Sequence, residues 1–419
     1  MSLARRIAHK VTLRAVWPSV FKRLGTVEGL EHLYREDPFV LVSNHESFYD
    51  HFVYGVLMNA GQGQLPAFLT KAESFHGARK AWFEEMGAVP VDRAAPAREL
   101  LATTDALLAG GRSLVVYPEG TRARTPEMLP FKDGAARFAV RAGVPVVPAA
   151  IVGTREVLPV GARRPKPGWI HVAIGEPLLP DPALPRGRRI ADLLERSEQA
   201  VHALRVRAAE LAVERPAAPA RRIALLAGEV IERSLAPGDP VPPPQRREQA
   251  GLLISIALGA DPHCLDAQVA KTRMTGLRAL EGSKLLGLPR IAAVRRGAER
   301  ALDRNPDHLM ANYLLGRWHL SMPALLGGRR ALAVDHFARA ELLGGGDSRY
   351  AMALGETFLA IGGREQAAAA FDRVLATPAP DERTARRHER ARAELANLGF
   401  SRPAIGAARS SDEYSEHRT

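Results

Sequence analysis

Apolar and polar residues alternate along the first half of the chain in a pattern that favours strands and helices in turn. Short apolar runs bounded by glycine or proline have the length of buried strands, and apolar residues three and four apart indicate amphipathic helices. Alternation of this kind predicts an α/β domain with a central, mostly parallel sheet flanked by helices. The predicted strands cover residues 39–43, 68–71, 88–92, 113–117, 144–152 and 169–174, and the predicted helices cover residues 75–86, 97–109 and 135–142.

The second half of the chain is dominated by helical spacing, and prolines mark its breaks. A long helix is predicted over residues 190–214, and the proline-rich residues 236–244 have the composition of a linker. We therefore predict a basic amphipathic N-terminal segment (1–35), the α/β domain (36–185), a helical linker with a proline-rich break (186–245), an all-α, helical-repeat-like domain (246–398) and a flexible tail (399–419).

A repeat signal lies inside the helical region. Leu354, Gly355, Phe358, Gly362 and Phe371 have spacings similar to those of a tetratricopeptide hairpin. A looser copy begins at the upstream Leu-Gly pair, 39 residues earlier, and an insertion near residues 323–328 would explain the excess over the usual period of about 34 residues. The pattern predicts paired helices that offer a surface for a protein partner, and a generic helical bundle remains the alternative.

Charge and cysteine content restrict the classes of partner. The 419 residues carry 58 basic and 46 acidic side chains, a net charge of +12, which favours an anionic partner such as a membrane surface or a phosphorylated substrate. Cys264 is the only cysteine, which excludes intramolecular disulfides and a thiolate metal cluster. We expect no nucleic-acid partner, since no recognition helix or basic-aromatic sheet pattern is found. No apolar run has the length of a membrane span.

The N-terminus is basic and amphipathic. Six basic residues between Arg5 and Arg23 precede the first acid, Glu28, and apolar residues lie between them at helical spacings. One interpretation is a helix in the interface of an anionic bilayer, and another is a helix packed on its own domain. An organellar transit peptide would have a similar composition. We expect a cytoplasmic protein that associates peripherally with a membrane.

His45 and Asp50 are the leading candidates for chemistry. His45 comes directly after the predicted strand 39–43, and ligand sites of α/β domains form at strand ends. Asp50 follows five residues later, so its carboxylate can orient the imidazole as a general base. His32 and Asp37 have the same separation, but they precede the strand, and we therefore favour His45.

Basic residues follow other predicted strands. Arg93 comes after the strand 88–92, and Arg122 and Lys132 come after the strand 113–117. Guanidinium groups match the geometry of phosphate oxygens. Strand ends that carry a base at one point and cations at others predict a site for an anion beside a hydroxyl group.

In order along the chain, these segments resemble the glycerolipid acyltransferases of the lysophosphatidic acid acyltransferase type. The resemblance spans about residues 25–185, less than half of the chain. Tyr117 stands where phenylalanine is commoner in that family. The matching blocks are Asn44-His45-x4-Asp50, residues 87–93, residues 117–122 and residues 144–148.

The resemblance implies a role for each matching residue. His45 would take the proton from the acceptor's hydroxyl, and Asp50 would hold the imidazole in the right tautomer. Acyl-CoA or acyl-carrier protein would be the co-substrate, with no bound cofactor, no metal and no covalent intermediate. The residues implied in binding the acceptor's glycerol phosphate are Arg93, Glu119, Gly120, Thr121 and Arg122, with Lys132 assisting by its charge.

The leading function is acyl transfer to the free hydroxyl of 1-acylglycerol 3-phosphate, which gives phosphatidic acid in phospholipid biosynthesis. Another lysophospholipid, or a lyso-aminolipid, is an alternative acceptor because the blocks do not fix its apolar part. A third possibility is a repeat-based interaction protein with a vestigial acyltransferase domain. The intact pair of His45 and Asp50 argues against the third possibility.

Overall fold

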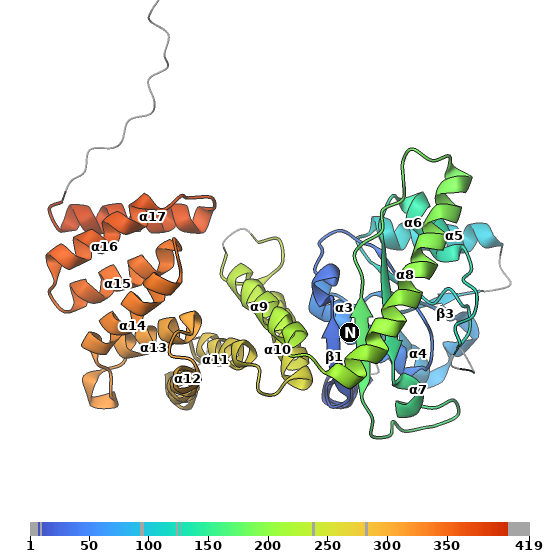
Figure 1. Ribbon diagram of the computed structural model, residues 1–419, viewed down its shortest axis with the longest axis horizontal. Coiled ribbons are helices and arrows are strands. Elements are labelled where there is room, and N and C mark those ends of the chain that lie inside the picture. The colour runs from blue at the N-terminus through green and yellow to red at the C-terminus, as the bar shows by residue number, and fades with distance from the viewer. Residues whose placement is uncertain are drawn as a thin grey trace, which may run out of the picture. The chain divides into compact units, whose positions relative to one another are not determined.

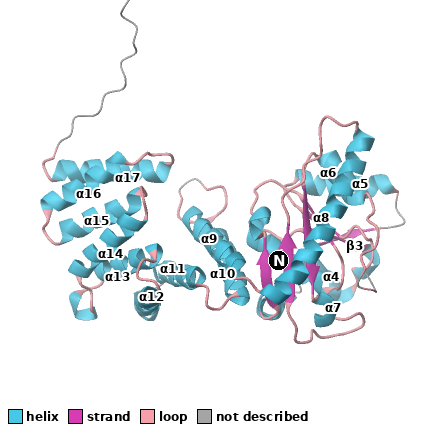
Figure 2. Cartoon of the chain, in the orientation of Figure 1, coloured by secondary structure: helices cyan, strands magenta, loops and turns pink. Residues whose placement is uncertain are grey.

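The computed structural model describes residues 7–8, 11–92, 96–122, 125, 127–236, 239–280 and 284–400. Contacts divide the chain into two compact units, Met1–Glu281 and Gly282–Thr419. Figure 1 shows the course of the chain within each unit, and Figure 2 shows that the described strands all lie in the first. Arg93 lies outside the described residues.

A seven-stranded sheet forms the centre of the first unit, in the order β1-β7-β6-β2-β5-β3-β4. Neighbouring strands are parallel, except that β6 pairs with β7 in the antiparallel direction. The predicted mostly parallel α/β sheet is therefore confirmed. The strands are β1 (Leu24–Glu28), β2 (Val40–Ser43), β3 (Ala67–Lys71), β4 (Ala88–Val91), β5 (Leu114–Val116), β6 (Val146–Val152) and β7 (Ile170–Ile174).

Helices cover both faces of this sheet, and for this reason the central strand β2 is apolar throughout. Leu41 packs in one hydrophobic cluster with residues of α3, whereas Val40 and Val42 pack in another with residues of α5, α6 and α8. A strand buried on both faces shows no polar alternation. The helices of this α/β part are α3 (Tyr49–Gln62), α4 (Gly77–Glu85), α5 (Ala97–Ala109), α6 (Gly134–Ala142), α7 (Thr154–Val157) and α8 (Arg186–Glu214).

The N-terminal segment packs partly on its own domain. It contains a π-helical turn (Thr12–Val16) and α2 (Trp17–Phe21), and the side chains of Trp17 and Val20 are buried in the core. Ile7 and Val11 are exposed. Within the described residues, no helix has the length and apolar character needed to cross a bilayer.

Three further helices belong to the first unit, although the sequence suggested a linker and a domain boundary at residue 245. They are α9 (Ala218–Arg233), α10 (Pro243–Ala260) and α11 (Leu265–Leu280). Helix α10 packs on α3 and β1, and the apolar faces of α9 and α10 complete the core. The prolines around residue 240 therefore mark a turn between two packed helices, and the compact units divide near residue 281.

The second unit is all-α, and its helix pairs confirm the predicted repeat-like region. A Cβ atom on Gly316 would lie 2.8 Å from the ring of Phe337, and one on Gly355 would lie 2.5 Å from the ring of Phe371. Glycine is therefore required at the same close approach in both pairs. The helices are α12 (Lys284–Arg304), α13 (Leu309–Ser321), α14 (Arg330–Leu343), α15 (Ser348–Ala360), α16 (Arg364–Ala376) and α17 (Glu382–Asn397), with a short 3-10 turn (Ala324–Leu326) where the insertion was expected.

Candidate active site

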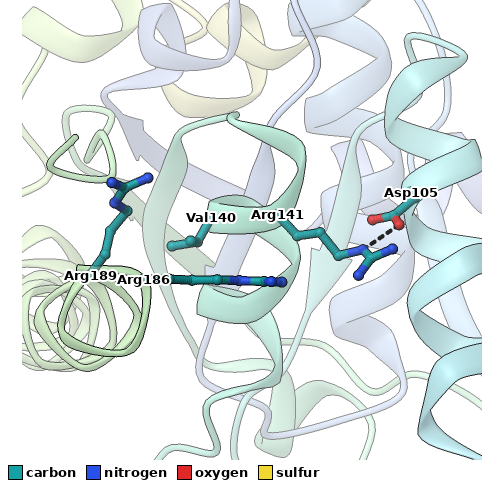
Figure 3. A pocket seen from close by; sticks show the side chains of 5 residues that line it. All are labelled: Asp105, Val140, Arg141, Arg186 and Arg189. Atoms are coloured by element: carbon teal, nitrogen blue, oxygen red, sulfur yellow. Dashed lines mark hydrogen bonds and ion pairs between the residues drawn. The ribbon is translucent and has the colours of Figure 1, made fainter. Parts of the chain in front are cut away.

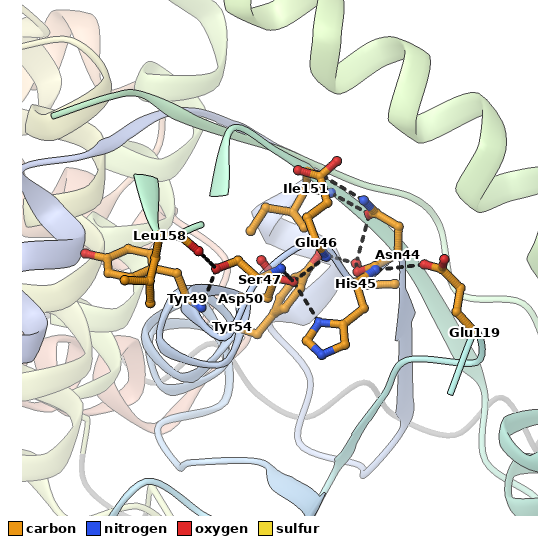
Figure 4. Close-up of polar contacts among 11 residues, drawn as sticks. Asn44, His45, Glu46, Ser47, Tyr49, Asp50, Tyr54, Glu119, Ile151 and Leu158 are labelled. Carbon is orange, nitrogen blue, oxygen red and sulfur yellow. Dashed lines mark hydrogen bonds and ion pairs between the residues drawn. The ribbon is translucent and has the colours of Figure 1, made fainter. Parts of the chain in front are cut away.

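The structure brings His45 and Asp50 together at the end of strand β2. The strand ends at Ser43 and helix α3 begins at Tyr49, so the loop 44–48 carries the histidine and the first turn of the helix carries the aspartate. His45 Nδ1 lies 2.8 Å from Asp50 Oδ2 (Figure 4). Both side chains are buried, with His45 9% exposed and Asp50 fully covered.

The Asp50 carboxylate is fixed by more than the imidazole. Its Oδ2 atom also accepts hydrogen bonds from the backbone N–H groups of Glu46 at 2.8 Å and Ser47 at 3.0 Å. The N-terminal end of α3 adds a favourable dipole for a negative charge. With Oδ2 acting as the acceptor, His45 Nδ1 carries the proton, and the lone pair on Nε2 remains available to accept one.

Asn44 ties the same loop to the neighbouring strand. Its side-chain amide donates to the carbonyl oxygen of Ile151 and accepts from the N–H of Ile151, both at 2.9 Å. The side chain thus continues the pairing of β2 with β6 after β2 has ended (Figure 4). Asn44 therefore positions the backbone from which His45 projects.

Glu119 is buried, and its carboxylate is occupied by backbone groups. Oε1 accepts from the N–H of His45 and Oε2 accepts from the N–H of Leu129, each at 2.9 Å. Glu119 is 3% exposed. The sequence placed Glu119 among the acceptor-binding residues, whereas this geometry makes it a brace between His45 and the loop that ends at Lys132.

The turn after β5 places Arg122 near the histidine loop and brings Gly120 close to Lys132. The guanidinium of Arg122 lies 4.2 Å from the ring centroid of Phe48, three residues after His45. Gly120 has a φ of 73°, and a Cβ atom there would lie 2.6 Å from Lys132 Nζ. The left-handed conformation favours glycine, and the absence of a Cβ atom leaves room for the end of the Lys132 side chain. Thr121 is exposed on the same turn.

Aromatic rings enclose the imidazole of His45. The ring of Tyr117 stacks on it with 4.0 Å between centroids, and the ring of His51 meets it edge-on at 5.4 Å. Burial, together with the nearby His45, lowers the pKa of His51 to about 4. His51 therefore stays neutral at neutral pH. No role was predicted for His51 from the sequence.

Replacing Tyr117 with phenylalanine is expected to stabilise the protein. The Tyr117 hydroxyl is buried and has no hydrogen-bond partner among the described residues. An unsatisfied buried hydroxyl costs about 1–3 kcal/mol, and the stacked ring would be retained. Thermal denaturation should show a higher midpoint for Tyr117→Phe, with unchanged turnover. A large loss of turnover would instead assign the hydroxyl to the substrate.

Glu46 is a second titratable group beside the pair, and no role was predicted for it from the sequence. Its side chain is buried, 8% exposed. Burial and the negative charge of Asp50 raise the pKa of Glu46 to about 7, from an ordinary value of 4.5. Glu46 is therefore protonated in mildly acidic solution and becomes a buried anion above neutrality.

The raised pKa of Glu46 predicts a loss of stability as pH rises. Between about pH 4.5 and 7 the folded state holds a proton that the unfolded state releases, so the free energy of unfolding falls across this window. The cost above pH 7 is on the order of 3 kcal/mol. Glu46→Gln should flatten the dependence of the melting temperature on pH. Parallel curves for the two proteins would contradict the assignment.

The alternative histidine pair is not assembled. His32 lies in a 3-10 turn (Leu30–Leu33), and in the portion of the chain that the structure covers no hydrogen bond or ion pair joins it to Asp37. Nor do the described residues contain a cluster of three or more histidine, cysteine or acidic side chains able to hold a metal ion.

A polar hollow between α5, α6 and the start of α8 is separate from this constellation. Its lining includes an ion pair between Asp105 and Arg141 (Figure 3). None of the residues predicted for the active site lines it. The other lining residues are Val140, Arg186 and Arg189.

Comparisons with known proteins show which family the α/β part resembles. A family model described as Acyltransferase matches residues 25–152. The chloroplastic 1-acyl-sn-glycerol-3-phosphate acyltransferase BAT2 of Brassica napus is 38% identical over 32% of this chain and 39% of that relative. The crystal structure of the 1-acyl-sn-glycerophosphate acyltransferase PlsC from Thermotoga maritima covers 48% of this chain and 79% of its own, with 26% identity and a TM-score of 0.37.

A bacterial relative is matched over most of its length. The 1-acyl-sn-glycerol-3-phosphate acyltransferase of Bacillus subtilis is 33% identical over 42% of this chain and 86% of that protein. The chain thus spans less than half of the plant relative but nearly all of the bacterial one. This chain belongs to the acyltransferase family that includes the 1-acyl-sn-glycerol-3-phosphate acyltransferases.

Proposed function

We propose that the protein transfers a fatty acyl group from a thioester to the free hydroxyl of 1-acylglycerol 3-phosphate and so makes phosphatidic acid. The observation that carries this proposal is the buried contact of 2.8 Å between His45 Nδ1 and Asp50 Oδ2. It prepares the opposite ring nitrogen, Nε2, as a general base at the end of the sheet.

The chemistry requires only groups that the site holds. As the acceptor's oxygen attacks the thioester carbonyl carbon, His45 Nε2 takes the proton from the hydroxyl. Asp50 stabilises the imidazolium that results. The tetrahedral intermediate collapses to the new ester and expels the thiolate, which recovers the proton from His45. The thiol product is CoA or the acyl-carrier protein, depending on the donor.

The acceptor's phosphate is bound by the turn after β5. Arg122 provides a fork of donors, Thr121 an exposed hydroxyl, and Gly120 the space that lets Lys132 approach. Arg93 contributes another cation in this proposal. Glu119 acts through the backbone of His45, as a positioning residue.

Membrane association and a protein partner complete the proposal. The acceptor lies in a bilayer, and the exposed Ile7 and Val11 stand in a segment with six basic residues and no acid. Such a segment binds an anionic surface, consistent with a cytoplasmic protein peripherally attached to a membrane. The helix pairs of the second unit provide a surface for a protein partner.

The acceptor is tested with a panel of lysolipids and both donor types. We expect the highest kcat/KM with 1-acylglycerol 3-phosphate, because its phosphate is a dense anion that matches Arg122. Faster acylation of a lysophospholipid with a larger headgroup, or of a lyso-aminolipid, would show that this other lipid is the preferred acceptor. Absence of transfer to every acceptor would favour an interaction protein with a vestigial domain.

Replacing Arg122 with glutamine is expected to raise the KM for the acceptor by about 10–100-fold, which corresponds to one or two lost hydrogen bonds to a charged group. The KM for the acyl donor should hardly change. Arg222→Gln is a matched control, because Arg222 is an exposed arginine on α9. Equal effects of Arg122→Gln on both substrates would contradict the assignment.

A further inference from the structure

A second polar hollow lies in the first unit, at the C-terminal end of helix α3. Its volume is about 270 Å³. The loop 34–36, the end of α3, and the segment from the end of α9 to the start of α10 line it. Asp50 lies in the first turn of α3 and Gln62 is its last residue, so the hollow and the catalytic pair are at opposite ends of that helix. We call it the Arg35 hollow.

Positive charge exceeds negative charge around the Arg35 hollow. Asp239 is fully engaged, since Oδ2 accepts from Arg233, and Oδ1 accepts from Arg246 and from the N–H of Val241. Arg233 also pairs with Glu36. Two carboxylates thus balance two guanidinium groups, and the third, Arg35, has no side-chain hydrogen bond or ion pair within the described residues.

The Arg35 hollow also contains buried donors and an acceptor that make no hydrogen bond within the described residues. Arg35 Nε is buried without a partner. The side chain of Arg246 is 4% exposed, and its Nη2, although 3.0 Å from Asp239 Oδ1, makes no hydrogen bond of good geometry. Gln62 Nε2 donates to the carbonyl oxygens of Arg35 and Asp37, which fixes the amide orientation and leaves the buried Oε1 without a donor.

We propose that the Arg35 hollow binds a phosphate group. Phosphate oxygens accept from Arg35 and Arg246 and neutralise the excess charge, since buried charges require a partner. A hydrogen phosphate also carries a hydroxyl, which donates to Gln62 Oε1. Sulfate has accepting oxygens but no hydroxyl at neutral pH, and therefore it leaves Gln62 Oε1 unsatisfied. The ligand is free phosphate or the phosphate of a small monoester.

The test is a titration of the 419-residue chain, followed by NMR through the side-chain amide of Gln62. Inorganic phosphate should shift this signal in a saturable way, and sulfate should bind more weakly. Arg35→Gln should weaken phosphate binding by about tenfold or more, as expected for a lost hydrogen bond to a charged group. Glycerol 3-phosphate serves as the monoester, and its binding or exclusion distinguishes the two sources.

Two controls separate this site from the active site. Arg122→Gln removes the proposed phosphate contact of the active site and should leave the Gln62 titration unchanged. Arg222→Gln removes an exposed arginine and should also leave it unchanged. No shift of the Gln62 signal in the wild-type protein, an equal shift in Arg35→Gln, or equal affinity for sulfate would overturn the proposal. The wild-type titration decides even where Arg35→Gln fails to fold.

Discussion

Replacing His45 with alanine is expected to lower turnover by about 10³-fold or more, because a positioned general base contributes about 10²–10⁴-fold. The fold should survive, since the loop is held by Asn44, Glu119 and Asp50 through contacts that do not involve the ring. Initial rates with 1-acylglycerol 3-phosphate and an acyl donor measure the effect, and circular dichroism checks the fold.

His32→Ala is the matched control for this experiment. His32 has the same spacing to an aspartate in the sequence but lies in a 3-10 turn away from strand β2. Its replacement should leave the rate nearly unchanged. If His45→Ala retained near-normal acyl transfer, or if His32→Ala lost as much, the wrong histidine would have been assigned.

Two replacements of Asp50 distinguish its role in orienting the His45 imidazole from the effect of its negative charge. Asp50→Ala removes the acceptor shared by His45 and two backbone N–H groups, so a loss of about 10³-fold or more is expected, together with lower stability. Asp50→Asn should lose less, about 10–100-fold. The backbone N–H groups of Glu46 and Ser47 would hold the amide oxygen where Oδ2 lies, so the imidazole would keep its tautomer and lose only the opposing charge.

The ratio of the turnover rates of the two Asp50 variants therefore shows how much the backbone donors contribute. The rates of both variants are measured side by side, with thermal midpoints to check stability. The difference in rate between Asp50→Asn and Asp50→Ala gives the contribution of orienting the His45 imidazole. Equal losses in Asp50→Asn and Asp50→Ala would mean that the backbone donors do not fix the side chain. The interpretation of the loop would then need revision.

Strand ends made much of the site predictable from the sequence. His45 follows β2 and Arg122 follows β5, and these strands are parallel neighbours in the sheet. Parallel neighbours end at the same edge, so residues far apart in the chain meet there. The parallel architecture itself follows from the alternation of strand and helix patterns. Local patterns and topology together thus predict where the base and a cation come close.

Long-range contacts explain why the role of Glu119 and the shifted pKa values of Glu46 and His51 were not predicted from the sequence. Glu119 resembles an acceptor-binding residue in its block, but its partners are backbone groups of His45, 74 positions away, and Leu129. The shifted pKa values of Glu46 and His51 arise from burial, which no local spacing encodes.

Helix α3 and strand β1 were not predicted from the sequence, because long-range packing determines their residue patterns. Helix α3 is buried between the sheet and α10, so apolar residues surround it and the amphipathic period is weak. Strand β1 is short and contains Gly25, which accommodates the ring of His171 from β7. Strand β7 lies far from β1 in the sequence, so the residues around β1 do not indicate that the two strands pair.

The most direct measurement of the central claim is the mass of the product. Wild-type protein incubated with 1-acylglycerol 3-phosphate and an acyl thioester should convert the acceptor into a species heavier by one acyl group less one hydrogen, identified as phosphatidic acid, while His45→Ala protein should give almost none. An acceptor whose mass stays unchanged with every donor, or equal product from both proteins, would contradict acyl transfer by His45.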